Sequence, residues 1–210
     1  MPNPPSSRSI KIDQDERGGW SSDRPRRDGA PPRPANVAVR GRALRPSALL
    51  RYSPGSLVLI VSGSAHAREE LAQRVVEDKA ALLSLAKVRS LLAARGMEDD
   101  EKALQLLDAT VAKRLAAGDS VALVAEDLDA TERERYVRMA SANRRPCHLV
   151  LVEATRDQVA DEDRDALNRL RRALDAGELG SEGFNTFLRL GGASLAEVKR
   201  LVFRAPQADD

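Results

Sequence analysis

Three short segments of almost continuous apolar residues constrain the fold of this chain most. They lie at residues 56–61 (SLVLIV), 120–125 (SVALVA) and 148–154 (HLVLVEA). Short runs of this kind, rich in Val, Leu and Ile, are typical of parallel strands that are covered on both faces. The stretches between them are long enough for crossover helices. The sequence therefore predicts an α/β fold of three layers, with a mostly parallel sheet between helices.

Apolar residues at helical spacing predict the helices. The first helix follows the first strand from about Ala67, and a second is expected within residues 78–96, where Leu82, Leu85 and Leu92 share a stripe before Gly96. Further helices are expected at residues 99–118, 129–145 and 157–176. A loop is then expected at residues 177–192, followed by a segment with capping-box spacing at Ser194 and Glu197 and an apolar last strand.

The N-terminal segment differs in composition from the rest of the chain. Residues 1–56 hold 11 Lys and Arg against 5 Asp and Glu, whereas residues 57–210 hold 23 against 27. Nine of the 11 prolines also lie in residues 1–56, which have almost no apolar periodicity. Such a segment buries too little apolar surface to offset the entropy of ordering. We therefore expect residues 1–45 to be a disordered basic tail and residues 46–210 to be the folded domain.

Composition and charge exclude several classes of protein. The longest apolar run, Leu57–Val61, is far shorter than the roughly 18 residues of a membrane span. No secretory signal opens the chain, and the single cysteine, Cys147, leaves no internal disulfide or multi-cysteine zinc site. We expect a cytoplasmic protein without a membrane partner, and its oligomeric state stays open.

The arginines of the tail suggest a partner. Arginine-rich segments make weak, salt-sensitive contacts with nucleic acid or with an acidic protein. The alternative is a tail that only keeps the chain soluble. The sequence favours this alternative, because aromatic and basic residues do not interleave as they do in a nucleic-acid platform.

The turn after the first strand is the strongest candidate for a ligand site. In an open parallel sheet, ligands bind at the carboxyl ends of the strands, where helix N-termini present free N–H groups to anions. A phosphate loop of the form GxxxxGK[ST] wraps phosphates with its backbone, reaches them with its lysine and binds magnesium through its hydroxyl. The candidate phosphate-binding residues are Ser62, Gly63, Ser64, Ala65, His66, Ala67, Arg68 and Glu69.

Four stretches carry a resemblance to a known family. They are SLVLIVSGSAHAREELAQRV (56–75), VVEDKAALL (75–83), VAKRLAAGDSVALVAEDLDATERERYVRMA (111–140) and EGFNTFLRL (182–190). In this order they resemble the P-loop kinase superfamily, in particular its polynucleotide-kinase-like and zeta-toxin-like branch, often labelled as AAA-family ATPases. The resemblance implies a nucleotide-binding fold that uses ATP and Mg²⁺. It also implies that Asp78 stands where the family carries the aspartate that activates a substrate hydroxyl as a base.

The residues that would carry this chemistry depart from the family pattern. Ser62 and Ala67 stand where the phosphate loop has glycines, Arg68 replaces the lysine, and Glu69 replaces the magnesium-binding hydroxyl. A planar guanidinium is not interchangeable with a compact ammonium, and an acid at this position repels phosphate. Val124 stands where the family has a strand-end aspartate. These departures indicate a degraded catalytic site.

The acids nearest to Val124 are Glu126 and Asp127, which we consider as a magnesium site. The alternative is that they cap the helix that follows. The paired lid arginines of the family have no clear counterpart. Arg156 and Arg164 are nearest in the sequence, and both are read more simply as exposed helix charges.

The sequence thus favours a pseudokinase: a binding or regulatory protein with weak or no nucleotide binding. One alternative is an active ATP-dependent kinase that phosphorylates a nucleic-acid 5′-hydroxyl or a small-molecule hydroxyl, with Arg68 on the phosphates and Asp78 as the base. Another is a scaffold protein that uses its basic tail to hold a partner.

Overall fold

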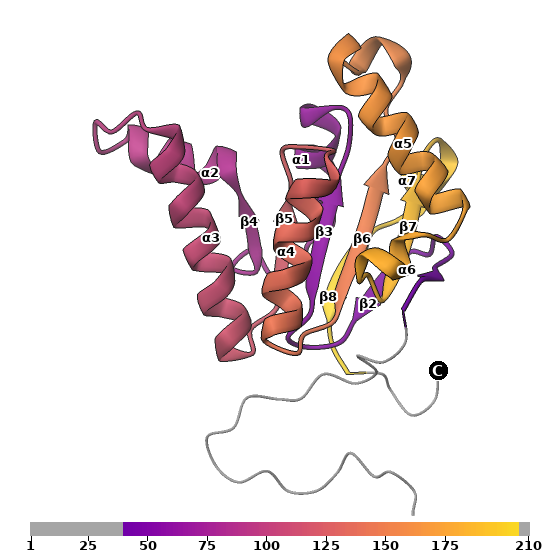
Figure 1. The fold of residues 1–210 in the computed structure, drawn as a ribbon, viewed down its shortest axis with the longest axis horizontal. Helices are drawn as coiled ribbons and strands as arrows, with labels where there is room; N and C mark the ends of the chain where they lie inside the picture. The colour runs from indigo at the N-terminus through magenta and orange to yellow at the C-terminus, as the bar shows by residue number, and fades with distance from the viewer. Residues whose placement is uncertain (1–39, 206–210) are drawn as a thin grey trace, which may run out of the picture. The chain divides into compact units, whose positions relative to one another are not determined.

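The computed structural model of this protein describes residues 40–205, which contain a six-stranded parallel sheet (Figure 1). The strands run in the order β1-β7-β6-β3-β5-β4, and every neighbouring pair is parallel. Their bounds are β1 (Arg42–Ala43), β3 (Leu57–Val61), β4 (Leu82–Ser84), β5 (Val121–Val124), β6 (Cys147–Val152) and β7 (Thr186–Leu190). The three strands predicted from apolar runs are β3, β5 and β6, and they are adjacent at the centre of the sheet.

Both faces of the sheet are covered, because alternate residues of each strand enter two separate cores. Leu57, Leu59 and Val61 face one core, and Val58 and Ile60 face the other. Five helices cover the first face: α2 (Leu85–Ala93), α3 (Asp100–Ala117), α4 (Ala130–Ala142), α5 (Arg164–Asp175) and α6 (Leu179–Glu182). The predicted three-layer α/β fold with a mostly parallel sheet is confirmed.

The second face is covered by helices and by a small second sheet. The helices are α1 (Ala65–Val75) and α7 (Ala193–Glu197). The small sheet pairs β2 (Leu49–Tyr52) with β8 (Arg200–Phe203) in parallel. β8 is the predicted last strand, but it joins this second sheet, where Leu201 and Val202 are buried.

The helix α3 shows how local sequence sets the element boundaries. The Asp99 carboxylate accepts a hydrogen bond from the Lys102 N–H at 2.9 Å and caps the helix start. Gly118 ends the helix in a left-handed conformation at φ 86°. One face is fully buried, at Ala103, Leu107, Val111 and Leu115. The predicted helix at residues 99–118 is therefore confirmed.

Three predicted elements differ from the structure. Leu82 belongs to strand β4 and not to a helix, because residues 82–84 pair with β5 at the edge of the sheet. The helix expected from residue 157 begins at Arg164, after two short 3₁₀ turns at Arg156–Gln158 and Asp161–Asp163. The loop expected at residues 177–192 contains α6 and strand β7.

The capping box expected at Ser194 and Glu197 is not formed. Helix α7 has Gly192 as its N-cap, and no side chain caps it. The Ser194 hydroxyl instead accepts a hydrogen bond from the Gly191 N–H at 3.0 Å, outside the helix. The spacing is present, but the helix begins at Ala193, so Ser194 lies within its first turn and not at the N-cap position.

The N-terminal tail predicted at residues 1–45 overlaps the described part of the chain only at residues 40–45. There Arg42 and Ala43 form β1 beside β7, and the Leu44 N–H donates to the Phe187 carbonyl at 2.8 Å. These residues belong to the folded unit, so this unit begins before residue 46. Residues 1–39, with the expected contacts to nucleic acid or an acidic protein, lie outside the described residues.

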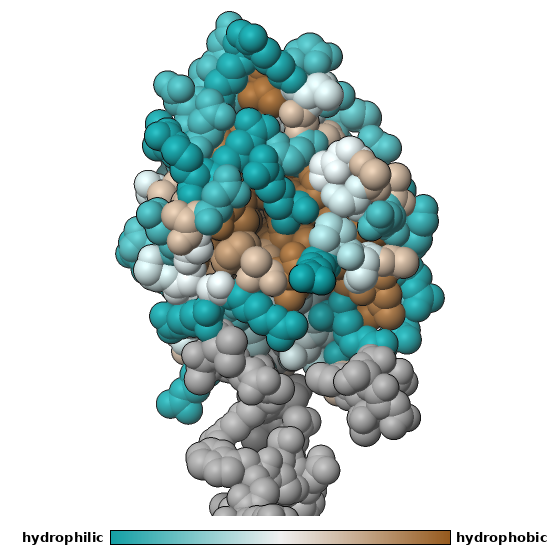
Figure 2. Space-filling model, turned by 90° about the vertical axis from the view of Figure 1, so that its right-hand side faces the viewer, coloured by the Kyte–Doolittle hydropathy of each residue, from teal (hydrophilic) through white to brown (hydrophobic). Residues whose placement is uncertain are grey.

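Seen from the side that carries β7 and α5, the surface is mainly hydrophilic, with apolar residues showing in a hollow near its middle (Figure 2). Across residues 40–205, no helix combines the length and the apolar character needed to cross a bilayer.

Candidate functional site

The candidate phosphate-binding turn between β3 and α1 is short and hydrogen-bonded to itself. Only Ser62, Gly63 and Ser64 separate the strand from the helix, and all three are buried. The Ser62 hydroxyl accepts a hydrogen bond from the Ser64 N–H at 3.1 Å. The Ser64 hydroxyl accepts one from the Ala67 N–H at 3.3 Å and caps α1. Two N–H groups that a phosphate loop would offer to an anion are therefore occupied by serine side chains.

Side chains from the segment after β6 fill the space over this turn. A Cβ atom added to Gly63 would lie 3.0 Å from Cγ1 of Val159 and 3.2 Å from Cδ2 of Leu167. Val159 and Leu167 are themselves buried in the core. A phosphate group is larger than one methyl group, so it finds no room against the Gly63 backbone in this arrangement.

Arg68, aligned with the phosphate-loop lysine, turns back onto the chain. Its Nη1 atom donates a hydrogen bond to the Ser62 carbonyl oxygen at 3.1 Å. His66 is exposed and lies 3.5 Å from the Glu70 carboxylate, while Ala65 is also exposed and Glu69 is half-buried. The structure thus uses Arg68 to close the turn.

Asp78 lies at the opposite end of the sheet from this turn. It follows α1, whose 11 residues span about 16 Å. It lines a small hollow with Asp119 and Ser120, which come just before β5 begins. Its carboxylate accepts a hydrogen bond from the Ala80 N–H at 2.9 Å. The structure therefore does not bring Asp78 to the carboxyl ends of the strands, where a base would have to act beside the turn.

Glu126 and Asp127 follow β5 and are held in separate interactions. Glu126 forms an ion pair with Arg89 of α2. The Asp127 carboxylate accepts from the Asp129 N–H at 2.9 Å, and the Asp127 N–H donates to the Glu132 carboxylate at 2.7 Å. Within residues 40–205, no three His, Cys, Asp or Glu side chains are grouped as a metal site requires. The predicted alternative, that these acids cap the following helix, is not met either, because α4 has Asp129 as its N-cap and no side-chain cap hydrogen bond.

Burial raises the pKa of Glu132, and the hydrogen bond from the Asp127 N–H only partly offsets this effect. Glu153, at the end of β6, shows the opposite balance. Burial works against its ionisation, but hydrogen bonds from Arg171 and Arg189 outweigh burial and lower its pKa. Glu153 therefore remains a charged anchor for these two arginines.

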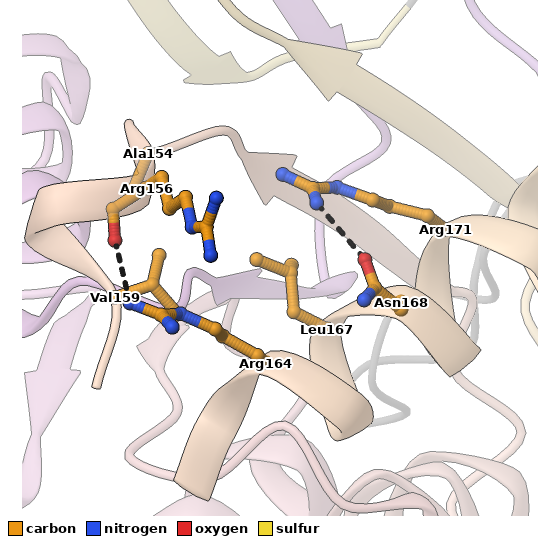
Figure 3. A pocket seen from close by; sticks show the side chains of 7 residues that line it. All are labelled: Ala154, Arg156, Val159, Arg164, Leu167, Asn168 and Arg171. Carbon is orange, nitrogen blue, oxygen red and sulfur yellow. Dashed lines mark hydrogen bonds between the residues drawn. The ribbon is translucent and has the colours of Figure 1, made fainter. Parts of the chain in front are cut away.

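A pocket that sequence reasoning missed lies beside the turn, at the carboxyl end of β6 (Figure 3). This arginine pocket has a volume of about 350 Å³ and is lined by Ala154, Arg156, Val159, Arg164, Leu167, Asn168 and Arg171. The sequence suggested only exposed helix charges for Arg156 and Arg164. One signal was available, because Arg164 and Arg171 are seven residues apart and so share one helix face.

Comparisons with known proteins identify no family. No protein-family model matches the chain, and no curated protein matches it. Among solved structures, the chain aligns with a crystal structure of a proposed kinase from Chloroflexus aurantiacus J-10-fl, with 15% sequence identity and a TM-score of 0.41. The alignment covers 66% of this chain and 85% of that chain.

Proposed function

We propose that this chain is a non-catalytic binding protein, a pseudokinase on a kinase-like α/β fold, which does not transfer phosphate and does not hold Mg²⁺-ATP at the turn between β3 and α1. The observation that carries this proposal is the closed turn at residues 62–64. The Ser64 and Ala67 N–H groups already donate to the Ser62 and Ser64 hydroxyls, and Val159 packs against Gly63. An anion would have to displace these serine hydroxyls to reach either N–H group.

The positions of the other candidates support the same proposal. Phosphoryl transfer depends on positioning a base, a metal ion and phosphate-binding cations around one reacting group. Here α1, which is about 16 Å long, separates Asp78 from the turn. Arg68 is bonded to Ser62, and Glu126 is paired with Arg89. The groups that an ATP-dependent kinase would need are therefore far apart or already occupied.

The experiment tests phosphoryl transfer and the metal-dependent nucleotide site together. The full chain is incubated with Mg²⁺ and γ-labelled ATP, with a 5′-hydroxyl oligonucleotide as acceptor, and label transfer is measured. Melting temperatures are measured in parallel with ATP, with and without Mg²⁺. We expect no transfer above a blank without protein, and no stabilisation by ATP that depends on Mg²⁺.

The active-kinase alternative predicts the opposite result. A site that binds Mg²⁺-ATP would raise the free energy of unfolding by about 2.7 kcal/mol when nucleotide exceeds its Kd a hundredfold. Label transfer by the wild-type chain that is lost in both Arg68→Gln and Asp78→Ala would overturn the proposal. Because Arg68 closes the turn, the melting temperature of Arg68→Gln without ligand serves as the folding control.

A further inference from the structure

The arginine pocket is positioned to bind a ligand independently of the closed turn. Arg156 comes from the 3₁₀ turn after β6, and Arg164 and Arg171 come from α5. Figure 3 shows the three side chains reaching into the same hollow from these two segments. No acidic residue is among those that line it. Three guanidinium groups therefore meet at one hollow, although Asp161 and Glu153 pair with two of them from outside its lining.

The hydrogen bonds of these arginines leave donors unused. Arg171 is committed, because its Nε and Nη2 atoms donate to Glu153 and its Nη1 atom donates to Asn168 Oδ1 at 3.2 Å. Arg164 pairs with Asp161 through Nη1 and donates to the Arg156 carbonyl through Nη2 at 3.4 Å, which leaves only its buried Nε atom without a partner. The Arg156 guanidinium has no hydrogen bond or ion pair with any residue in the range 40–205. The Arg156 guanidinium thus keeps its donors for a bound anion, whereas Arg164 keeps only Nε.

The apolar side of the pocket sets the kind of ligand. Val159 and Leu167 are 5% and 2% exposed, and Ala154 lies beside them. A volume of about 350 Å³ is at the lower end of the range for small-molecule sites. Apolar walls also strengthen a charge-assisted hydrogen bond, because they exclude water from it. The pocket therefore suits a compact molecule with one apolar part and one strongly anionic part.

We propose that the arginine pocket binds a small phosphorylated molecule without a metal ion. Arg156 and Arg164 donate to its phosphate, Arg171 is held beside them by Glu153 and Asn168, and Val159 and Leu167 contact its apolar part. The fork of a guanidinium matches two phosphate oxygens, and several cations suit a dianion better than a single carboxylate. The proposal goes beyond the non-catalytic role proposed above and uses neither Arg68 nor the backbone of the closed turn.

The test uses phenyl phosphate as the probe, with the full chain in EDTA, and measures affinity by calorimetry. We expect saturable binding that is tighter than that of inorganic phosphate, because only phenyl phosphate can contact Val159 and Leu167. Arg156→Gln and Arg164→Gln are each expected to weaken binding about tenfold or more. Benzoate, which has the same ring with a carboxylate, is expected to bind more weakly than phenyl phosphate.

Arg169→Gln is the matched control. Arg169 lies on the same helix, is exposed, and does not line the pocket, so the variant removes the same charge elsewhere. We expect it to bind phenyl phosphate as the wild type does. Arg156→Gln is expected to fold normally, since Arg156 is exposed and its side chain has no partner among the described residues.

Three results would overturn the proposal: no binding at millimolar phenyl phosphate, unchanged binding in Arg156→Gln, or an equal loss in Arg169→Gln. The last would indicate a general charge effect. Failure here is distinguishable from failure of the proposed function. If the proposed function fails, ATP raises the melting temperature only with Mg²⁺, and Arg68→Gln reduces that increase. The pocket is tested separately, by phenyl phosphate binding in EDTA and through Arg156→Gln.

Discussion

Replacing Arg133 by alanine is expected to lower the free energy of unfolding by about 3 kcal/mol, the lower end of the range for breaking a buried ion pair. The Arg133 side chain is 5% exposed. Its Nε and Nη2 atoms donate to the Glu182 carboxylate at 3.0 and 2.9 Å, and Nη1 donates to the Leu128 carbonyl. The variant leaves both acceptors without this partner, but Glu182 is 29% exposed and keeps some solvent.

Urea unfolding of Arg133→Ala and Arg138→Ala provides the comparison. Both residues lie on α4, but Arg138 is exposed and forms only a surface ion pair with Glu134. We expect Arg138→Ala to change stability by no more than about 0.5 kcal/mol. Similar losses in the two variants would mean that the contact between α4 and α6 through Arg133 contributes no more than a surface pair.

The free energy of unfolding is also expected to decrease strongly at low pH, because of the buried residue His148. His148 is buried between the two sheets, with its ring 4.7 Å from that of Tyr52 and Nδ1 2.8 Å from the Thr186 hydroxyl. Burial lowers the pKa of His148 to about 4 from its ordinary value of 6.5. Burial also raises the pKa of Tyr52, so Tyr52 stays neutral in this range.

The direction in which the free energy of unfolding changes with pH follows from the pKa of His148 in the folded and in the unfolded chain. Above pH 6.5 the ring is neutral in both the folded and the unfolded chain, and its contribution to stability is fully present. As the pH falls from 6.5 to about 4, the unfolded chain binds a proton that the folded chain does not. We expect a loss of about 3 kcal/mol from this residue over that interval.

The measurement is urea unfolding at a series of pH values for the wild type, His148→Gln and His66→Gln. His148→Gln should lack this part of the decrease, because glutamine does not titrate. His66 is the other histidine of the chain and its side chain is 84% exposed, so His66→Gln should follow the wild-type curve. If the curves for the wild type and His148→Gln ran parallel, the buried ring would not be the cause of the pH dependence.

The central elements of the fold were predictable because their patterns are local. β3, β5 and β6 are covered on both faces, so every residue in them except His148 is apolar, and the run is visible in the sequence. The helix α3 carries its own start and stop signals in Asp99 and Gly118. Such signals need no information about distant parts of the chain.

The edge elements were not predictable in the same way. β4 has three residues, and its Leu82 and Leu85 also fit a helical stripe, so pairing with β5 decides between strand and helix. β7 lies in a stretch rich in glycine and polar residues, yet it pairs with β6 over five residues. In both cases a long-range partner supplies the hydrogen bonds that select the strand.

The candidate site likewise has features that the local sequence predicts and features that depend on distant residues. The sequence identified the turn after β3 as the place to examine, because a strand followed by glycine and a helix is a local signal. Whether that turn is open depended on Val159 and Leu167, which lie about a hundred residues further along the chain. The placement of Asp78 likewise depended on the length of α1 and on where β4 begins.

The sequence by itself determined the α/β class, the three central strands and the mismatch of residues 62–69 to the GxxxxGK[ST] pattern, because these follow from residue identity and short-range periodicity. Only the tertiary structure decided that the turn is filled, that Asp78 lies at the far end of the sheet, and that Arg156, Arg164 and Arg171 share one pocket. The physical reason is that burial and hydrogen-bond partners are set by packing between distant segments, which no local pattern records.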